Sequence, residues 1–362
     1  MAIDKSQHRS PFTQTVIDIY KEEAPVPSHF VSMFTPKPTN TKYVSIEVER
    51  DSEVISVDVN RLGEGTRNMF SKSSEKIFLP PMHDQYFDAT ALDSYDKMVN
   101  SPRNAKLTGS AARGVAMKLV KLQNKVRRAE ELQAAQIMET GIVTINQGVN
   151  IDYKRKATSK VDPGVGNYWS TATAPIEAQL IAVGTFFRQS GKSNVNVIDM
   201  TCSGATYTAL KASNYFANNA NYNNVNLNDI RKPEKVPAGS VYHGQITAGS
   251  FRFNIWVYDE TYQDESKVTQ RYMAENQTAF TPASGNMLDL AYGGLPEVVR
   301  DPSRVEFPQY IRNVSAKFMI YNKIGENRAS HIFGVRSAPL CVPVTIDRIY
   351  TLQTLGEGGE QG

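Results

Sequence analysis

One helical stripe constrains the fold of this chain more than any other feature of its sequence. Apolar residues recur at steps of four and three from Val115 to Leu132, and Gly141 follows as a stop. We therefore predict one helix from Arg113 to Glu139, which at 1.5 Å per residue would span about 40 Å. The stripe consists of Val115, Leu119, Leu122, Val126, Ala129 and Leu132.

The same region carries the strongest local charge in the sequence. Eight basic residues with no acid among them lie between positions 103 and 128, whereas the whole chain balances 40 basic against 37 acidic residues. A surface that faces phosphates would explain them, because lysine and arginine neutralise phosphates without reading bases. A solvated helix face, or one paired with acidic segments of a partner, explains them equally well. The basic residues are Arg103, Lys106, Arg113, Lys118, Lys121, Lys125, Arg127 and Arg128.

A β-ribbon pattern precedes this helix. Apolar and polar residues alternate over Tyr43–Arg50 and again over Val54–Asn60, and the chain returns through Ile77, Phe78 and Leu79 to two prolines. A ribbon with one narrow apolar stripe is marginal in water, so a surface outside the local chain should cover it. Upstream, five prolines between positions 11 and 38 predict an extended arm over residues 1–41.

The second half of the sequence mixes helix and strand signals. A helix should have Pro175 in its first turn and end at Gly191, a strand should run from Val195 to Met200, and Ser203 should open a second helix. These elements predict a compact α/β unit within an α+β chain. Further strand patterns lie at Ile142–Ile145 and Val149–Tyr153 as a hairpin, and at Val241–Thr247, Phe251–Tyr258, Val314–Tyr321, Ala329–Val344 and Ile346–Leu352.

Motifs for catalysis, cofactors and metals are weak. Gly191-Lys192-Ser193 imitates the end of a phosphate-binding loop, but it closes a helix and enters a strand, which is the wrong context. Cys202 lies at a strand-to-helix turn, where a thiol could act as a nucleophile, so a thiol-dependent hydrolase remains an alternative. No histidine pairs with it in a known motif. We expect no catalytic residue, no cofactor and no metal site.

The cysteines and the N-terminus bear on the cellular compartment. Cys202 and Cys341 have no paired spacing that indicates a disulfide framework or a zinc site, so a reducing cytoplasm is expected. The charged N-terminus lacks the apolar stretch of a signal peptide, and no run approaches the roughly 18 apolar residues of a membrane span. We expect a soluble chain.

The order of these features resembles a known family over about residues 40 to 355. It is similar to the major capsid proteins of tailed bacteriophages, most closely the lambda-like major capsid protein E family with the Hong Kong 97-type fold. The matching features are the ribbon Thr41–Asn60 with its return to Pro80, the helix ending in Arg127–Gln133, the turn Gly166–Ser170, the strand Val195–Met200, Tyr242-His243-Gly244, Trp256-Val257-Tyr258 with Tyr262, and Ser337–Leu340 in a long strand.

The resemblance implies a shell protein with a recognisable division of the chain. The parts would be an N-terminal arm (1–41), an extension loop with its base (42–90), a peripheral domain with a spine helix (91–171), an axial domain (172–327), a long peripheral strand (328–344) and a final strand with a tail (345–362). Hexamers and pentamers would form an icosahedral virion capsid around double-stranded DNA. An encapsulin-like compartment that encloses protein cargo is the alternative with the same fold.

The resemblance also implies partners and two groups of site residues. The partners would be copies of the chain, packaged DNA in non-specific contact, a separate scaffolding protein, a portal and in some relatives a decoration protein, with assembly in the host cytoplasm and no membrane. The spine helix would face the genome through Arg113, Lys118, Lys121, Lys125, Arg127 and Arg128. The extension loop would contact a neighbouring subunit through Val54, Ile55, Val57, Val59, Ile77 and Phe78.

Overall fold

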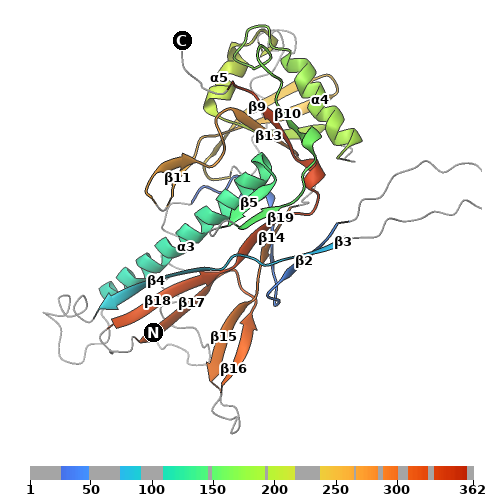
Figure 1. The fold of residues 1–362 in the computed structure, drawn as a ribbon. Coiled ribbons are helices and arrows are strands. Elements are labelled where there is room, and N and C mark those ends of the chain that lie inside the picture. The colour runs from blue at the N-terminus through green and yellow to red at the C-terminus, as the bar shows by residue number, and fades with distance from the viewer. Residues whose placement is uncertain are drawn as a thin grey trace, which may run out of the picture.

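The computed structural model shows an elongated chain with a lobe at one end and a long helix running along the remainder (Figure 1). Within the described residues, no helix is long and apolar enough to cross a membrane. The structure describes residues 26–48, 74–90, 109–145, 149–191, 195–216, 237–264, 266–283, 288–300, 309–324 and 330–356.

Helix α3 (Gly109–Glu139) is the longest element, with 31 residues. It begins four positions before the predicted start and ends where predicted, so the long helix is confirmed. Its end is fixed by Gly141, whose φ of 76° favours glycine, and by Arg155, whose Nη1 donates to the carbonyl oxygens of Met138 and Glu139 at 2.9 and 3.3 Å. A Cβ atom at position 141 would lie 2.9 Å from the Arg155 side chain.

The first half of α3 covers a three-stranded antiparallel sheet. The strands are ordered β17-β18-β4, and their bounds are β4 (His83–Thr90), β17 (Met319–Ile324) and β18 (Ser330–Ser337). Leu119 and Val120 of the helix pack on Phe333 and Val335 of β18. Because side chains alternate across a strand, every second residue of β4 and β18 faces away from α3.

Two predicted strands are each divided in the structure. The strand predicted over Ala329–Val344 is interrupted at Ala338, and the chain passes from β18 into β19 (Pro339–Pro343), which pairs with β14 (Leu288–Tyr292) in another sheet. Pro339 has no backbone N–H, which suits a position where the chain changes sheets. The strand predicted over Val314–Tyr321 is wrong in the same way: β16 (Gln309–Val314) forms a hairpin with β15 (Leu295–Arg300), and β17 starts afresh.

The lobe at the other end contains the largest sheet. Its six strands are ordered β7-β20-β13-β8-β10-β9. The two helices predicted from the sequence, α4 (Ile176–Gln189) and α5 (Gly204–Ala212), lie in the same lobe as this sheet (Figure 1). A Cβ atom at Gly184 of α4 would collide with the Phe251 ring, so glycine permits close helix-sheet packing. The strands are β7 (Lys160–Val161), β8 (Val197–Cys202), β9 (Ser240–Ala248), β10 (Phe251–Tyr258), β13 (Gln277–Pro282) and β20 (Tyr350–Gln353).

Short elements join these bodies. The strand predicted over Tyr43–Arg50 is confirmed as β2 (Val44–Val48), which pairs antiparallel with β3 (Ser74–Phe78) in a ribbon that projects from the body (Figure 1). The second predicted strand, Val54–Asn60, lies outside the described residues. The hairpin after α3 is also confirmed. The remaining bounds are β5 (Ile142–Ile145), β6 (Val149–Asp152), β11 (Thr261–Gln263), β12 (Thr269–Arg271) and the short 3-10 helices Ala157–Ser159 and Ile346–Arg348, the latter replacing the start of the predicted strand Ile346–Leu352.

The described part of the predicted N-terminal arm packs against its own chain. A 3-10 helix (Val31–Met33) precedes β1 (Thr35–Pro38), which pairs in parallel with β14. Phe30 and Phe34 are buried in the core that α3 shares with β14 and β19. The prolines exclude an α-helix as expected, but from Val26 onward this segment is not a free arm, because its aromatic side chains fill the core.

Candidate assembly surfaces

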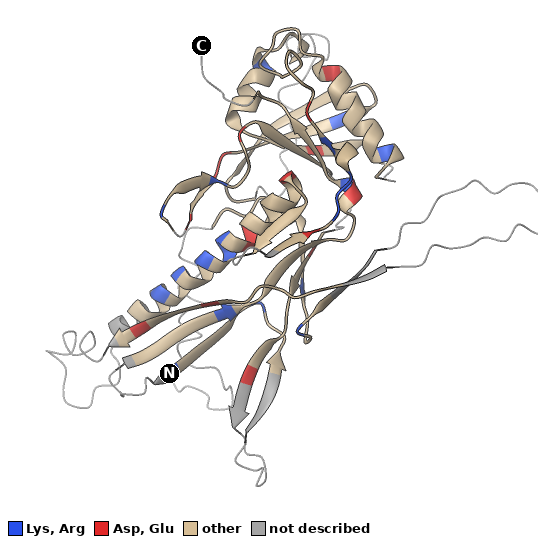
Figure 2. Cartoon of the chain, viewed as in Figure 1, with Lys and Arg blue, Asp and Glu red and all other residues tan. Residues whose placement is uncertain are grey.

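Four basic side chains form an exposed row along α3. Lys118, Lys121, Lys125 and Arg128 are exposed, and their spacing of three and four residues places them on one side of the helix. Figure 2 shows the basic positions recurring along this helix. The row spans about 15 Å of helix axis. Lys118 also places its Nζ 5.2 Å from the centre of the Phe87 ring. We call these four residues the basic row.

The other two predicted helix residues are placed differently. Arg127 follows Lys125 by two positions, which is about 200° around a helix, and its guanidinium lies 5.5 Å from the Phe318 ring centre. Burial lowers its pKa, while the charges of Glu130 and Tyr292 raise it. Arg127 is therefore part of the packing between α3 and the neighbouring sheet rather than of the basic row. Arg113 lies in α3, at a position whose side chain the structure does not describe.

The ribbon presents apolar side chains to solvent at its base. Ile77 is 64% exposed, and Tyr43 and Leu79 are each 51% exposed. Phe78 faces inward, with its ring centre 5.6 Å from that of Tyr153. The four other predicted loop residues, Val54, Ile55, Val57 and Val59, lie outside the described residues.

A further exposed aromatic side chain lies on the face of the three-stranded sheet that points away from α3. Tyr86 of β4 is 62% exposed and lies opposite Gly334 of β18. The Tyr321 ring lies across Gly334, where a Cβ atom would collide with it. Asp84 accepts hydrogen bonds from the Tyr321 hydroxyl at 2.7 Å and from Nε of Arg336 at 2.8 Å. This face is thus fixed by cross-strand contacts while remaining open to solvent.

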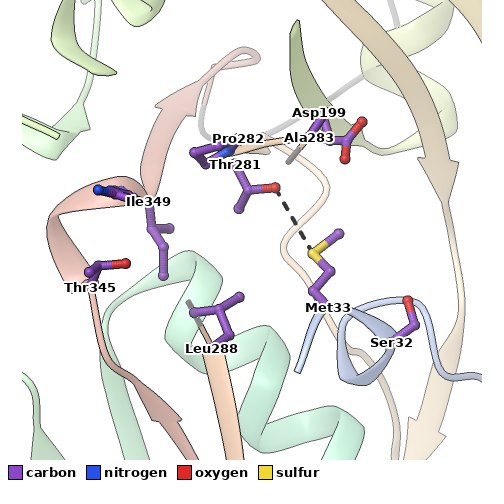
Figure 3. A pocket seen from close by; sticks show the side chains of 10 residues that line it. Ser32, Met33, Asp199, Thr281, Pro282, Ala283, Leu288, Thr345 and Ile349 are labelled. Carbon is purple, nitrogen blue, oxygen red and sulfur yellow. Dashed lines mark hydrogen bonds between the residues drawn. The ribbon is translucent and has the colours of Figure 1, made fainter. Parts of the chain in front are cut away.

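A pocket of about 210 Å³ lies between the six-stranded sheet and the N-terminal segment (Figure 3). Among the described residues that line it, the one carboxylate, that of Asp199, is already engaged: it accepts from Nδ2 of Asn254 at 2.6 Å and from Nε1 of Trp256 at 3.3 Å. Burial raises the pKa of Asp199. Across the pocket, Oγ1 of Thr281 donates to Sδ of Met33 at 4.0 Å. Within the described ranges, no group of three or more His, Cys, Asp and Glu could hold a metal ion.

The thiol proposed as a possible nucleophile is in the wrong environment. Cys202 is fully buried, and its Sγ lies 3.7 Å from the Trp256 carbonyl oxygen. Burial raises the thiol pKa, which disfavours the thiolate needed for attack. The adjacent Ser203 caps α5, accepting from the Thr206 amide and donating to the Glu275 carbonyl. These contacts give structural roles to both side chains.

Two adjacent buried carboxylates were not singled out by the sequence analysis. Glu130 accepts from the Tyr292 hydroxyl at 3.1 Å and lies 3.8 Å from Nζ of Lys317, whereas Glu131 binds backbone amides of the N-terminal segment. Burial raises the pKa of each carboxyl group, and these contacts oppose that rise. In a sequence, two consecutive glutamates in a charged helix suggest side chains exposed to solvent. Their burial depends on which faces of the helix pack against other elements, and this is visible only in the fold.

Comparisons with known proteins agree with one another. The family model described as phage major capsid protein E matches residues 13–353. A crystal structure of the putative capsid protein of a prophage from E. coli CFT073 shares 14% identity, covers 98% of this chain and 100% of that chain, and has a TM-score of 0.62. A phage-related protein from Bordetella bronchiseptica RB50 shares 10% identity, with 94% and 96% covered and a TM-score of 0.52. No curated protein sequence matches.

Proposed function

This chain belongs to the phage major capsid protein E family, and we propose that hexamers and pentamers of it close into an icosahedral shell around double-stranded DNA. It has the Hong Kong 97-type capsid fold, its role is that of a phage major capsid protein, and its place is the virion capsid. The observation that carries the proposal is the family match over nearly the whole chain. That match favours a phage shell over an encapsulin-like compartment and over a thiol-dependent hydrolase.

The proposed subunit has an axial and a peripheral part. The axial part contains the six-stranded sheet with α4 and α5, and the peripheral part contains α3 with the three-stranded sheet. Pairing of β14 with β19, and of β17 with β18, supports assigning β14 to β17 to the peripheral part, although residues up to 327 were assigned to the axial domain from the sequence. The arm, extension loop and tail complete the proposed division.

The ribbon is proposed to lie on a neighbouring subunit. Its exposed Ile77 and Leu79 are costly to leave in water, and a two-stranded ribbon gains stability when another surface covers it. Changing both residues to Ser should leave the subunit folded, because both are exposed, but should lower the yield of particles. Val165→Ser, at a side chain 94% exposed away from the ribbon, is the matched control. Normal particle yield from the double variant would remove the ribbon from the interface.

The basic row is proposed to face the packaged DNA. Four cations on one side of a straight helix can neutralise phosphates without entering a groove, so the contact would be independent of sequence. The competing partner is an acidic segment of a scaffolding protein or a neighbouring subunit. Replacing Lys118, Lys121 and Lys125 by Gln separates the two: genome contact predicts normal empty precursor shells and fewer stable filled heads, whereas scaffold contact predicts loss of the precursor shells themselves.

The remaining partners belong to the same proposal. We expect a separate scaffolding protein, a portal and, on some shells, a decoration protein, with assembly in the host cytoplasm. Electron microscopy of the purified protein tests the function, since a shell protein yields closed particles and an enzyme does not. Extracting DNA from particles made during infection distinguishes a virus head from a compartment loaded with protein.

A further inference from the structure

Residues 26–38, which we call the N-terminal strap, cross the junction between α3 and the six-stranded sheet. Near the start of the strap, the Ser28 amide donates to the Ala238 carbonyl at 3.0 Å. At its end, β1 pairs with β14. Two of the four β1 residues are prolines, which donate no hydrogen bond. Lys37 of β1 nevertheless forms an ion pair with Asp289 at 2.6 Å, so the strap is attached at β1 as well as through residues 28–34.

One carboxylate holds the middle of the strap. Glu131 of α3 is fully buried and accepts from the amides of Phe30 and Val31, each at 2.9 Å. The Tyr258 hydroxyl of β10 donates to the same carboxylate at 3.0 Å. Among the described residues, these neutral donors rather than a cation hold Glu131. Hydrogen bonds to a charged acceptor in a water-poor site are among the stronger ones, whereas the Lys37–Asp289 ion pair has an exposed lysine and is screened by water. Glu131 is therefore the main buried polar attachment of the strap.

The strap covers a defined seat on the large sheet. Nε2 of His29 and Oγ1 of Thr201 share a hydrogen bond of 2.8 Å, and the His29 ring stacks on Tyr258 at 5.4 Å between centres. Ser32 and Met33 supply part of the pocket wall in Figure 3. Departure of the strap would uncover Thr201 and Tyr258 and open this pocket on one side.

Helix α3 and the six-stranded sheet also contact each other without the strap. Oγ1 of Thr351 in β20 donates to the Met138 carbonyl of α3 at 2.8 Å. Parts of a protein can open locally at a lower free energy than the whole fold. We propose that the strap opens as a unit while α3 and the six-stranded sheet stay folded. In this proposal, the hydrogen bonds that the Glu131 carboxylate accepts from the strap set how often the strap opens.

The adjacent carboxylate provides a matched control. Glu131→Gln keeps the size of the side chain but removes its charge and turns an NH₂ group toward a strap amide. Glu130→Gln makes the same change one residue away, at a group that binds Tyr292 and Lys317 instead of the strap. Hydrogen exchange followed by NMR or mass spectrometry should show strap amides at residues 30–34 exchanging at least tenfold faster in Glu131→Gln, with β8 and β10 unchanged. In Glu130→Gln the strap should exchange at the wild-type rate.

Two results would overturn the proposal. One is exchange that accelerates equally in the strap and in β8, which would make Glu131 a general stabiliser; the other is no acceleration in the strap. Chymotrypsin gives an independent measure, because cleavage after Phe30 or Phe34 requires an open strap. An unchanged cleavage rate in Glu131→Gln would contradict the proposed role of Glu131 in holding the strap closed. If that variant does not fold, Tyr258→Phe, which removes one donor to the same carboxylate, must show the same strap-specific acceleration. Dissociated subunits suffice, so the result does not depend on whether shells form.

Discussion

Replacing Lys118, Lys121 and Lys125 by Gln should reduce the salt dependence of DNA binding by a predictable amount. All three side chains are exposed, so the free energy of unfolding should change by no more than about 0.5 kcal/mol per residue. Lys118 is the exception, because its contact with the Phe87 ring adds about 0.5 to 1 kcal/mol. The variant should therefore fold normally and differ in electrostatics.

The magnitude follows from the geometry of the basic row. Each phosphate contact adds about 0.9 to the slope of log affinity against log salt concentration, so three lost contacts lower the slope by about 2.7. Between 50 and 200 mM salt, wild-type subunits should then lose about 40-fold more affinity for a short duplex than the variant loses. The roughly 15 Å row faces enough phosphates for this, because duplex DNA carries one charge per about 1.7 Å.

The assay is fluorescence anisotropy of a labelled 30-base-pair duplex with dissociated subunits over a salt series. The control changes Lys211, Lys267 and Lys323 to Gln, three exposed lysines on other elements, and alters the net charge equally. A change of slope in the first variant alone supports the basic row. Equal changes in both variants would assign the effect to net charge, and no change in either would refute the phosphate-facing role.

Three further predictions concern stability and reactivity. Burial lowers the pKa of His29 to about 3, so below pH 6.5 the unfolded chain binds a proton that the folded chain does not. Chemical denaturation should therefore show that the free energy of unfolding falls by about 2 kcal/mol between pH 7 and pH 5. A His29→Gln variant with the same loss would contradict this. Gly334→Ala should lower the free energy of unfolding by about 1 to 3 kcal/mol, because the new Cβ would collide with Tyr321. Gly114→Ala in α3, where a Cβ meets nothing within 4 Å, should instead raise it by about 1 kcal/mol. Thermal melts that rank the two variants in the opposite order would count against the packing of Tyr321 on Gly334. Both cysteines should resist iodoacetamide at pH 8 until the chain unfolds, because burial raises both thiol pKa values, and mass spectrometry showing rapid labelling of the folded subunit would revive a reactive thiol.

The sequence predicts elements whose pattern is local and strong. Helix α3 follows from its apolar period, α5 from its Ser203 cap, and β9 with β10 from alternation about Gly249. Strands β13, β14 and β15 escaped prediction because they are short and, in β13 and β14, buried on both faces, so they show no alternation. The sheet change at Ala338 depends on a distant pairing with β14, which no local window contains.

The candidate surfaces were predicted in part for the same reason. Charge is visible in sequence, so Lys118, Lys121 and Lys125 were found, but the direction of Arg127 depends on packing against Phe318. Burial of Glu131 was hidden because its partners are backbone amides about 100 residues upstream. Backbone donors carry no residue signature, so a contact of this kind emerges only from the fold.

A cryo-electron microscopy reconstruction of the assembled particle would show directly whether this chain builds a closed shell and which way its surfaces face. We expect a closed icosahedral shell in which the base of the ribbon contacts a neighbouring subunit and the basic row on α3 faces the lumen. A protein that forms no closed particle, or a shell in which Lys118, Lys121 and Lys125 lie on the outer surface, would contradict it.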